Sequence, residues 1–457
     1  MLSWIRRGKP REKRVVVLGL DCLEPSLAFG EYADAMPTLT RLCQEGGYGR
    51  LESVIPPITV PAWACMMTGK DPGTLGIYGF RNRTDYGYEK LSIVTSRDVR
   101  ERTVWDRLTE DGKRSVVIGV PPGYPPKPLN GYAIGCFLTP NARTDYTYPP
   151  SLKGELEEQF GEYQFDVRDF RTDDKRWLLD QIYQLTEQRF RVAQHLLTTK
   201  PWDFFMVVDM GPDRLHHGFW KFCDPLHRKH EPDNPFRNAM REYYRFLDEQ
   251  LQRFLEHVPD DAAVWIVSDH GAKRMDGGIC INEWLLREGY LCVKRPPEGI
   301  QRFEELEVDW SRTVAWGEGG YYSRIFLNVR GREPQGIVAP SEYESVRDEL
   351  TRKLEALGDE RGNPIGTRVY KPEEIYERVN GIAPDLIAVL GDLHWRSVGT
   401  VGWGTVWVHE NDTGPDDANH AQHGLYVARG VPDLRGERDL HLLEVHERLL
   451  RLLGGGT

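Results

Sequence analysis

A threonine hydroxyl held between two prolines is the first feature of this sequence that suggests chemistry. In PPITVPAWACMMTG, residues 56–69, Thr59 lies between Pro57 and Pro61. Each proline fixes its own φ and restricts the residue before it, so the backbone around the hydroxyl is held still. The following AWACMMT contains no turn former and predicts a short buried helix. Thr59 would then either cap this helix or face a bound anion, because helix N-termini attract negative charge.

Carboxylates and imidazoles, the side chains that bind metal ions, occur at four further places, each beside a predicted strand. They are Asp21 after the first strand, Asp213 and His217 in DRLHH, Asp269 and His270 in SDHG, and His420 in NHAQHG. In a helical DRLHH, the spacing of four places Asp213 and His217 on one face, within reach of one ion. Mixed carboxylates and imidazoles suit Zn²⁺ or Mn²⁺. Two such ions about 4 Å apart can clamp the attacking and leaving oxygens of a phosphoryl transfer.

The elements that must position these residues form a regular alternation of strands and helices. Apolar runs at 14–21, 115–120, 204–208 and 262–268 predict buried strands, and amphipathic patterns at 36–46, 103–112, 173–199 and 236–257 predict helices. This alternation predicts an α/β fold, a three-layer, doubly wound and mostly parallel sheet. Ligands gather at the carboxyl ends of such strands. Asp21, Asp209 and Asp269 follow three of the predicted strands directly.

The pattern of predicted secondary structure changes beyond Lys294. Residues 312–338 alternate and are rich in turn formers, which predicts antiparallel strands, and a helix at 341–357 and a strand at 385–390 follow. The core resumes with a strand at 424–428 and closes with a helix at 438–453. We therefore expect a flexible basic arm over 1–14, a catalytic core formed by 15–295 and 381–457, and an inserted cap over 296–380.

Composition excludes several classes of function. With a net charge of −11 over 457 residues, the chain lacks the excess of positive charge that nucleic-acid binding needs. The basic N-terminus lacks the apolar segment of a secretory signal, and no apolar run reaches the roughly 18 residues that span a membrane. Seven scattered cysteines without a C-x-x-C pair indicate reduced thiols, so we expect a cytoplasmic protein.

Taken in order, these motifs resemble the type I phosphodiesterase/nucleotide pyrophosphatase family of the alkaline phosphatase superfamily. The matching motifs are LD at Asp21, PPITVPAW around Thr59, MMTGKDPG around Gly69, D-x-x-x-H from Asp213 to His217, SDHG around Asp269, and H-x-x-x-G from His420 to Gly424. The resemblance extends from Val15 to about Gly430. It implies an alkaline-phosphatase-like core with a cap, a small phosphorylated substrate such as a nucleotide or another phosphodiester, and two divalent ions, Zn²⁺ or alternatively Mn²⁺.

The resemblance also implies roles for individual residues. Thr59 would be the nucleophile and a metal ligand. The first ion would be held by Asp21, Thr59, Asp269 and His270, and the second by Asp213, His217 and His420. In-line attack would give a phospho-threonine that water then releases, so the expected activity is hydrolysis of phosphodiester or pyrophosphate bonds. The alternative is a phosphomutase, phosphotransferase or phosphomonoesterase that uses the same two-metal core.

Three positions near the expected ligands compete with them. His216 also faces Asp213 at helical spacing and is the alternative to His217. His423 directly precedes a glycine and is the alternative to His420. Asp209 ends its strand, where a buried partner that orients a ligand is expected.

The substrate side of the site departs from the pattern of family members that act on nucleotides. These members commonly have an asparagine at the position that Phe80 occupies, where it donates a hydrogen bond to the phosphoryl oxygen. Arg81 and Asn82 follow, and either is a candidate replacement. Trp63 and Phe80 are candidate walls of a leaving-group pocket, with a place in the core as the alternative. Glu318 is expected on the surface or in the cap.

Overall fold

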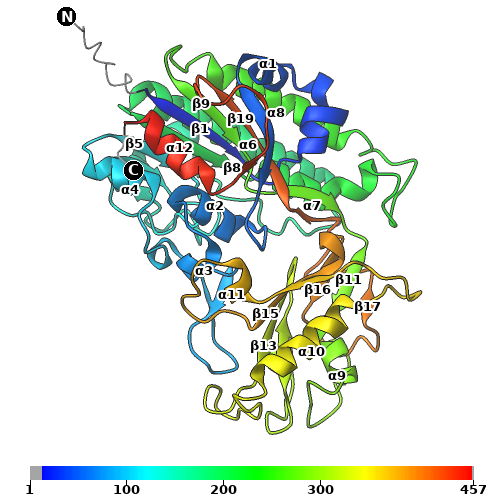
Figure 1. Cartoon of the computed structure of the whole chain (residues 1–457). Helices are drawn as coiled ribbons and strands as arrows, with labels where there is room; N and C mark the ends of the chain where they lie inside the picture. The colour runs from blue at the N-terminus through cyan, green and yellow to red at the C-terminus, as the bar shows by residue number, and fades with distance from the viewer. Residues whose placement is uncertain (1–12, 455–457) are drawn as a thin grey trace, which may run out of the picture.

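The computed structural model describes residues 13–454, which form two lobes (Figure 1). The expected basic arm lies almost wholly outside the described residues. The larger lobe is built on a ten-stranded sheet with the order β20-β2-β19-β9-β1-β8-β5-β6-β7, in which β21 also pairs with β2. In chain order these strands are β1 (Val15–Leu20), β2 (Gly47–Glu52), β5 (Ser115–Ile118), β6 (Gly131–Ile134), β7 (Thr147–Tyr148), β8 (Phe204–Asp209), β9 (Ala263–Val267), β19 (His423–Arg429), β20 (Gly436–Glu437) and β21 (Leu440–His441).

The centre of the sheet is parallel, as the buried apolar runs predict. β1 pairs in parallel with β8 on one side and with β9 on the other, and Leu20 lies opposite Asp209. Every residue of these three strands is buried. The late strand β19 instead runs antiparallel to both β9 and β2. The carboxyl ends of β1, β8 and β9 therefore meet at one edge.

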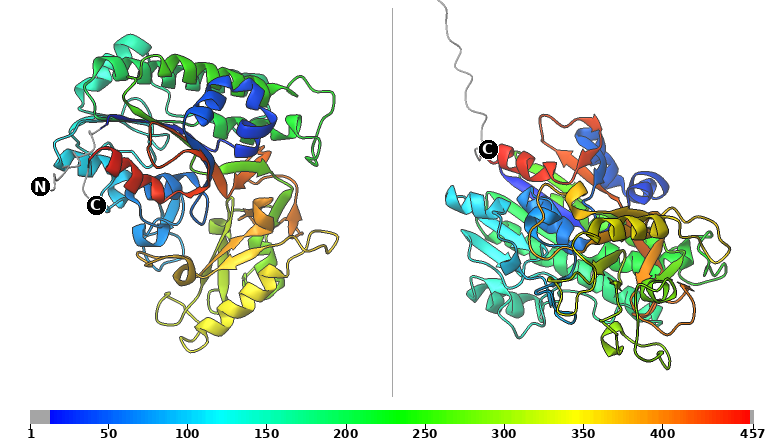
Figure 2. Two further views of the ribbon diagram at one scale, coloured as in Figure 1. Left: turned by 45° about the horizontal axis from the view of Figure 1, so that its top comes forward. Right: turned by 60° about the horizontal axis from the view of Figure 1, so that its bottom comes forward.

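Helices cover both faces of this sheet and give the expected three layers (Figures 1 and 2). One face carries α1 (Pro37–Glu45), α6 (Lys175–Thr199), α7 (Gly211–Cys223) and α8 (Ala239–Leu255). The other carries α2 (Thr59–Thr68), α4 (Val104–Glu110) and α12 (Glu444–Leu452). The helix expected at 438–453 begins only at Glu444, because Leu440 and His441 form β21 beside β2. The shorter helices α3 (Pro72–Leu75) and α5 (Ser151–Phe160) and the hairpin of β3 (Arg81–Arg83) and β4 (Leu91–Ile93) lie in the connections.

The smaller lobe contains two further sheets. The first has the order β12-β13-β15-β14 and consists of β12 (Ala315–Glu318), β13 (Ser323–Leu327), β15 (Leu386–Val389) and β14 (Arg368–Tyr370). The second has the order β16-β11-β17 and consists of β16 (Trp395–Val398), β11 (Gly277–Cys280) and β17 (Trp407–Val408). Its helices are α9 (Ile281–Arg287), α10 (Tyr343–Glu355) and α11 (Pro372–Ile375). The expected antiparallel strands within 312–338 are thus present as β12 and β13.

The buried core of the smaller lobe runs from Ile279 to Val406 and so extends beyond both ends of the segment 296–380 that the sequence suggested as a cap. The division of the chain into core and cap stays a prediction. An antiparallel ribbon of β10 (Gly271–Arg274) and β18 (Ala418–Ala421) carries the chain into this lobe and back. No helix among residues 13–454 combines the length and apolar character that crossing a membrane requires.

Candidate active site

The seven residues expected to hold metal ions meet at the carboxyl edge of β1, β8 and β9. Asp21 follows β1, α7 begins just after β8, and Asp269 and His270 lie shortly after β9. Thr59 is the first residue of α2, whose capping position is taken by Ile58, and His420 lies on β18. None of the seven side chains is more than 2% exposed.

The first cluster surrounds the Thr59 hydroxyl. His270 Nε2 lies 3.2 Å from Thr59 Oγ1, 3.2 Å from Asp269 Oδ2 and 3.9 Å from Asp21 Oδ1. Asp21 Oδ2 accepts a hydrogen bond from Trp63 Nε1 at 2.6 Å. Among the described residues, Asp21 Oδ1 and Asp269 Oδ2 have no hydrogen-bond partner although both are buried. One oxygen of each carboxylate is therefore left facing the histidine nitrogen.

The second cluster adjoins the first. Asp213 Oδ1 lies 3.3 Å from His217 Nε2 and 3.7 Å from His420 Nε2, and the two histidine nitrogens are 3.3 Å apart. The helical spacing of four in DRLHH does bring Asp213 and His217 together. The rings of His270 and His420 stack with centroids 3.8 Å apart, which joins the two clusters.

The competing residues lie elsewhere. His216 belongs to neither cluster, and its Nε2 lies 3.0 Å from the Tyr244 hydroxyl. His423 starts β19 opposite Glu52 and belongs to neither cluster. Asp209 Oδ2 accepts a hydrogen bond from Thr186 at 2.8 Å and so fixes α6 to the end of β8. The geometry thus favours His217 and His420 over the alternatives.

The electrostatics of the two clusters suit bound cations. Burial, reinforced by the negative charge of Asp213, raises the pKa of Asp21 well above its usual value, and burial together with Asp21 does the same to Asp269. Burial also acts to raise the pKa of Asp213, but His217 and Arg214 outweigh it and hold that pKa well below normal. Burial lowers the pKa of His270 to about 4. Carboxylates that are buried this close together are costly when ionised unless a cation is shared among them.

Asp416 is a contributor that sequence reasoning missed. Its Oδ1 lies 2.7 Å from Nδ1 of His217, and its Oδ2 accepts hydrogen bonds from Arg171 at 3.2 Å and from Tyr321 at 3.3 Å. Burial opposes protonation of His217, but Asp416 and Asp213 outweigh it and raise the pKa of His217 to about 9. The only sequence signal was the stretch GPDDAN just before His420, and loop spacing does not show which acid turns inward.

A cavity of about 490 Å³ opens over the clusters and lies between the two lobes. Thr59, Asp213 and His420 lie on its wall, and both Phe80 and Arg81 line it as expected for substrate contacts. Tyr321, Tyr322 and Glu318 reach it from the smaller lobe, although the sequence suggested only a surface or cap position for Glu318. Substrate would therefore meet residues from both lobes.

Two of the expected substrate contacts are placed differently. Trp63 is fully buried, packs on Gly19 and donates its indole N–H to Asp21, so it supports a ligand instead of lining the cavity. Asn82 Oδ1 accepts a hydrogen bond from the Tyr78 N–H at 2.9 Å, and its Nδ2 donates to the Gly79 carbonyl at 3.2 Å. Both ends of the Asn82 amide are thus used to hold the turn.

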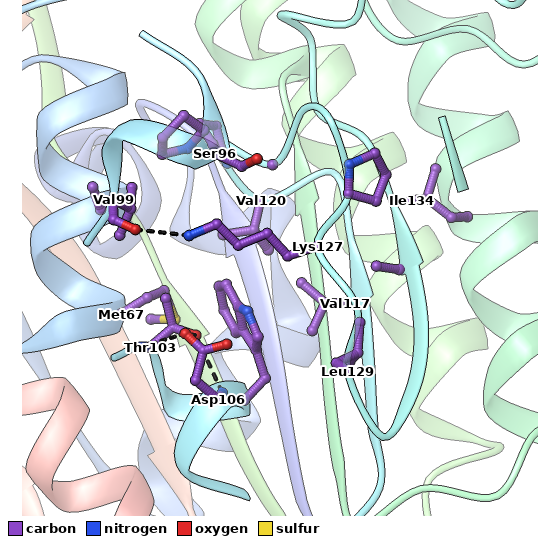
Figure 3. Close-up of a pocket in the computed structure, with 17 residues that line it drawn as sticks. Met67, Ser96, Val99, Thr103, Asp106, Val117, Val120, Lys127, Leu129 and Ile134 are labelled. Atoms are coloured by element: carbon purple, nitrogen blue, oxygen red, sulfur yellow. Dashed lines mark hydrogen bonds between the residues drawn. The ribbon is translucent and has the colours of Figure 1, made fainter. Parts of the chain in front are cut away.

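A second, smaller pocket lies behind α2, beside α4 and a proline-rich loop (Figure 3). Its volume is about 50 Å³ and its walls are mostly apolar. The amine of Lys127 donates a hydrogen bond to the Val99 carbonyl at 2.7 Å, and Asp106 accepts one from the Thr103 hydroxyl at 2.8 Å. The charged groups of this pocket are therefore already paired, and it contains none of the seven expected ligands.

Comparison with known proteins gives a family match and a shared fold. The family model described as "Type I phosphodiesterase / nucleotide pyrophosphatase" matches residues 15–424. No curated protein sequence gives a significant match.

Solved structures match over nearly the whole chain. The murine ectonucleotide pyrophosphatase/phosphodiesterase 5 is similar with a TM-score of 0.55 at 13% identity, covering 97% of this chain and 96% of that one. An inactive form of it in complex with AMP has a TM-score of 0.54 at 13% identity, with the same coverage of 97% and 96%. Phosphonoacetate hydrolase from Sinorhizobium meliloti 1021, in complex with phosphonoformate, has a TM-score of 0.59 at 16% identity and covers 96% of each chain. These likenesses show an alkaline-phosphatase-like fold.

Proposed function

Because the chain belongs to the type I phosphodiesterase/nucleotide pyrophosphatase family, we propose that it hydrolyses phosphodiester or pyrophosphate bonds with Thr59 as the nucleophile. One observation carries this proposal. Thr59 Oγ1 lies 3.2 Å from His270 Nε2, at the junction of both ligand clusters and on the wall of the cavity. A hydroxyl at this place can meet a phosphorus atom that enters from the cavity.

The two clusters fit two divalent ions, for which Zn²⁺ is our first choice and Mn²⁺ the second. Asp21, Thr59, Asp269 and His270 would hold one ion, and Asp213, His217 and His420 the other. When bound, such ions lower the pKa of a coordinated hydroxyl and stabilise negative charge on phosphoryl oxygens.

The chain's own residues would position the reaction. In the first step a bond forms between Thr59 Oγ1 and phosphorus while the bond from phosphorus to the leaving oxygen breaks, and the proton lost from the Thr59 hydroxyl ends on the departing alcohol or phosphate. In the second step a water oxygen bonds to phosphorus and the bond to Oγ1 breaks, which restores the hydroxyl. Trp63 holds Asp21 through its N–H, and Asp416 holds His217 through Nδ1. Both contacts keep the site in one arrangement through the two steps.

The test compares two threonines of the same helix. Thr59→Ala should lower turnover of bis(4-nitrophenyl) phosphate by more than about 1,000-fold, since it removes the nucleophile. Thr68→Ala is the matched control, because the Thr68 hydroxyl donates to the Ala64 carbonyl inside α2 at 2.7 Å, away from the cavity. Both are assayed after chelation and reloading with Zn²⁺ or Mn²⁺, on a diester, a pyrophosphate, a phosphomonoester and a phosphonate. Acid quenching during turnover of bis(4-nitrophenyl) phosphate should trap a 4-nitrophenyl phosphoryl group on the peptide that contains Thr59, and full turnover by Thr59→Ala would refute the proposal.

A further inference from the structure

Five arginines line the cavity, and three of them are neutralised by carboxylates. Arg214 binds Asp166 through two hydrogen bonds of 2.7 and 2.8 Å. Arg171 and Arg396 share Asp416, at 3.2 and 3.5 Å. These three arginines hold acids of the site in place, and their charge is largely balanced by the protein.

The other two, Arg81 and Arg324, have no such partner. No carboxylate oxygen among residues 13–454 lies within 4.0 Å of either guanidinium. Arg324 lies on β13, is only 8% exposed, and donates a hydrogen bond from Nη1 to the backbone carbonyl of Arg81. The two residues therefore adjoin across the contact between the lobes. Arg83, two residues later on β3, forms an ion pair with Glu333 at 3.2 Å. A missing carboxylate partner is therefore not a property of every arginine on this strand.

Glu318 is the acid that faces these two arginines. It lies opposite Arg324 in the pairing of β12 with β13 and also lines the cavity, yet it does not come within ion-pair distance. Burial raises the pKa of its carboxyl. Even when ionised, this single carboxylate balances only one of the two guanidinium charges. The cavity wall at Arg81 and Arg324 is left with net positive charge, in a protein whose net charge is −11.

We propose that Arg81 and Arg324 bind a second anionic group of the substrate, a carboxylate or a phosphate, at a distance from the phosphorus that reacts. The inference rests on the proposed function, since it takes the cavity as the substrate site. Arg324 is mostly buried, and a buried guanidinium without a carboxylate is unfavourable unless an anion completes it, whereas Arg81 is exposed beside it on the cavity wall. Guanidinium groups bind planar and tetrahedral oxyanions strongly. Apolar walls at Phe80 and Ile93 leave room for an uncharged body between the two acidic ends. Arg81 would then select substrates instead of donating to the scissile phosphoryl group.

The test uses three 4-nitrophenyl diesters that release the same chromophore: those of butyl, 3-carboxypropyl and 3-phosphonopropyl phosphate. The wild type should favour at least one anionic probe over the butyl probe by about 10–100-fold in kcat/KM, as expected for hydrogen bonds to a charged group. Arg81→Gln and Arg324→Gln should each lower this ratio by about 10-fold. Arg330→Gln is the control and should leave the ratio unchanged, because Arg330 is an exposed arginine just beyond β13 that does not line the cavity.

A wild-type ratio near one would overturn the proposal, as would variants that slow all three probes equally, since Arg81 and Arg324 would then act on the shared phosphoryl group. The two anionic probes separate a carboxylate from a phosphate as the preferred group. Calorimetry with the Thr59→Ala variant measures the ratio of binding affinities for the anionic and butyl probes without hydrolysis. If the wild type hydrolyses no probe, the proposed function fails, whereas the binding ratio still supports or overturns the role of the two arginines.

Discussion

The Asp416 carboxylate lies 2.7 Å from Nδ1 of His217, and this contact leaves Nε2 of the same ring facing Asp213 and His420. A histidine whose Nδ1 is held in this way presents Nε2 in one orientation and with a more basic lone pair. The second ligand cluster therefore depends on a residue that does not itself reach the cavity.

Asp416→Asn should weaken metal binding at the second cluster by about 10–100-fold, because it removes the charge that orients His217. Titration of the metal-free protein with Zn²⁺ measures how many ions bind and with what affinity. Asp417→Asn is the adjacent control, since the Asp417 carboxyl forms no hydrogen bond to His217 or His420 in the described chain. Equal affinity in Asp416→Asn and the wild type would show that the histidine is positioned by other contacts.

His420→Ala should lower metal affinity or turnover by more than about 10-fold, because it deletes a ligand of the second cluster. His423→Ala should stay within about 2-fold of the wild type on the same assays, since His423 is half-buried at the start of β19 and belongs to neither cluster. The two histidines are three residues apart, but only His420 contacts the cluster. If His423→Ala lost more metal affinity or turnover than His420→Ala, the second cluster would instead include the histidine at the start of β19.

Gly19→Ala should destabilise the fold by about 1–3 kcal/mol, as overpacking of a filled core does. A Cβ at Gly19 would lie 2.6 Å from Trp63 Cη2 and 2.7 Å from Val208 Cγ2. Relief of this clash should move Trp63 away from Asp21 and also weaken metal binding at the first cluster. Gly30→Ala is the control because nothing lies within 4 Å of its Cβ. Urea unfolding and metal content check both effects, and a Gly19→Ala protein as stable as the wild type would contradict the packing.

His446 should make the folded state sensitive to acid. Burial lowers the pKa of this histidine from 6.5 to about 4. The unfolded chain takes up a proton below about pH 6.5 and the folded chain does not, so the stability from neutral His446 is lost as the pH falls from 6.5 towards 4. Urea unfolding at pH 7 and pH 5 should therefore show a loss of about 2 kcal/mol in the wild type that His446→Gln lacks. The same loss in both proteins would assign the acid sensitivity to other groups.

The sequence predicts the parts of the site that local pattern controls. Asp21 and Asp269 follow unmistakable buried strands, and the spacing in DRLHH is helical, so their convergence follows from parallel sheet geometry. Asp416 lies in an irregular loop and reaches His217 only through the fold, and the N–H of Trp63 finds Asp21 because Gly19 leaves room for its ring. Such contacts depend on the relative placement of distant segments, which no periodicity encodes. Likewise, the smaller lobe is wider than 296–380 because β11, β16 and β17 pair across more than a hundred residues.

The β10–β18 ribbon has a consequence for how this protein can diversify. Ala272 pairs with His420 in that ribbon, so the smaller lobe leaves and re-enters the larger one at neighbouring backbone positions. The entropy of closing a chain segment grows only slowly with its length, so the ribbon can tolerate insertions, deletions or replacement of the segment that it closes. Six of the seven expected ligands precede the ribbon and the seventh, His420, lies in it, whereas Arg324 and the tyrosines of the cavity lie in the segment that the ribbon closes. Evolution can therefore replace the part of the cavity wall that Arg324 and the tyrosines form as one contiguous segment, while Arg81, Phe80 and the reaction centre are inherited with the larger lobe.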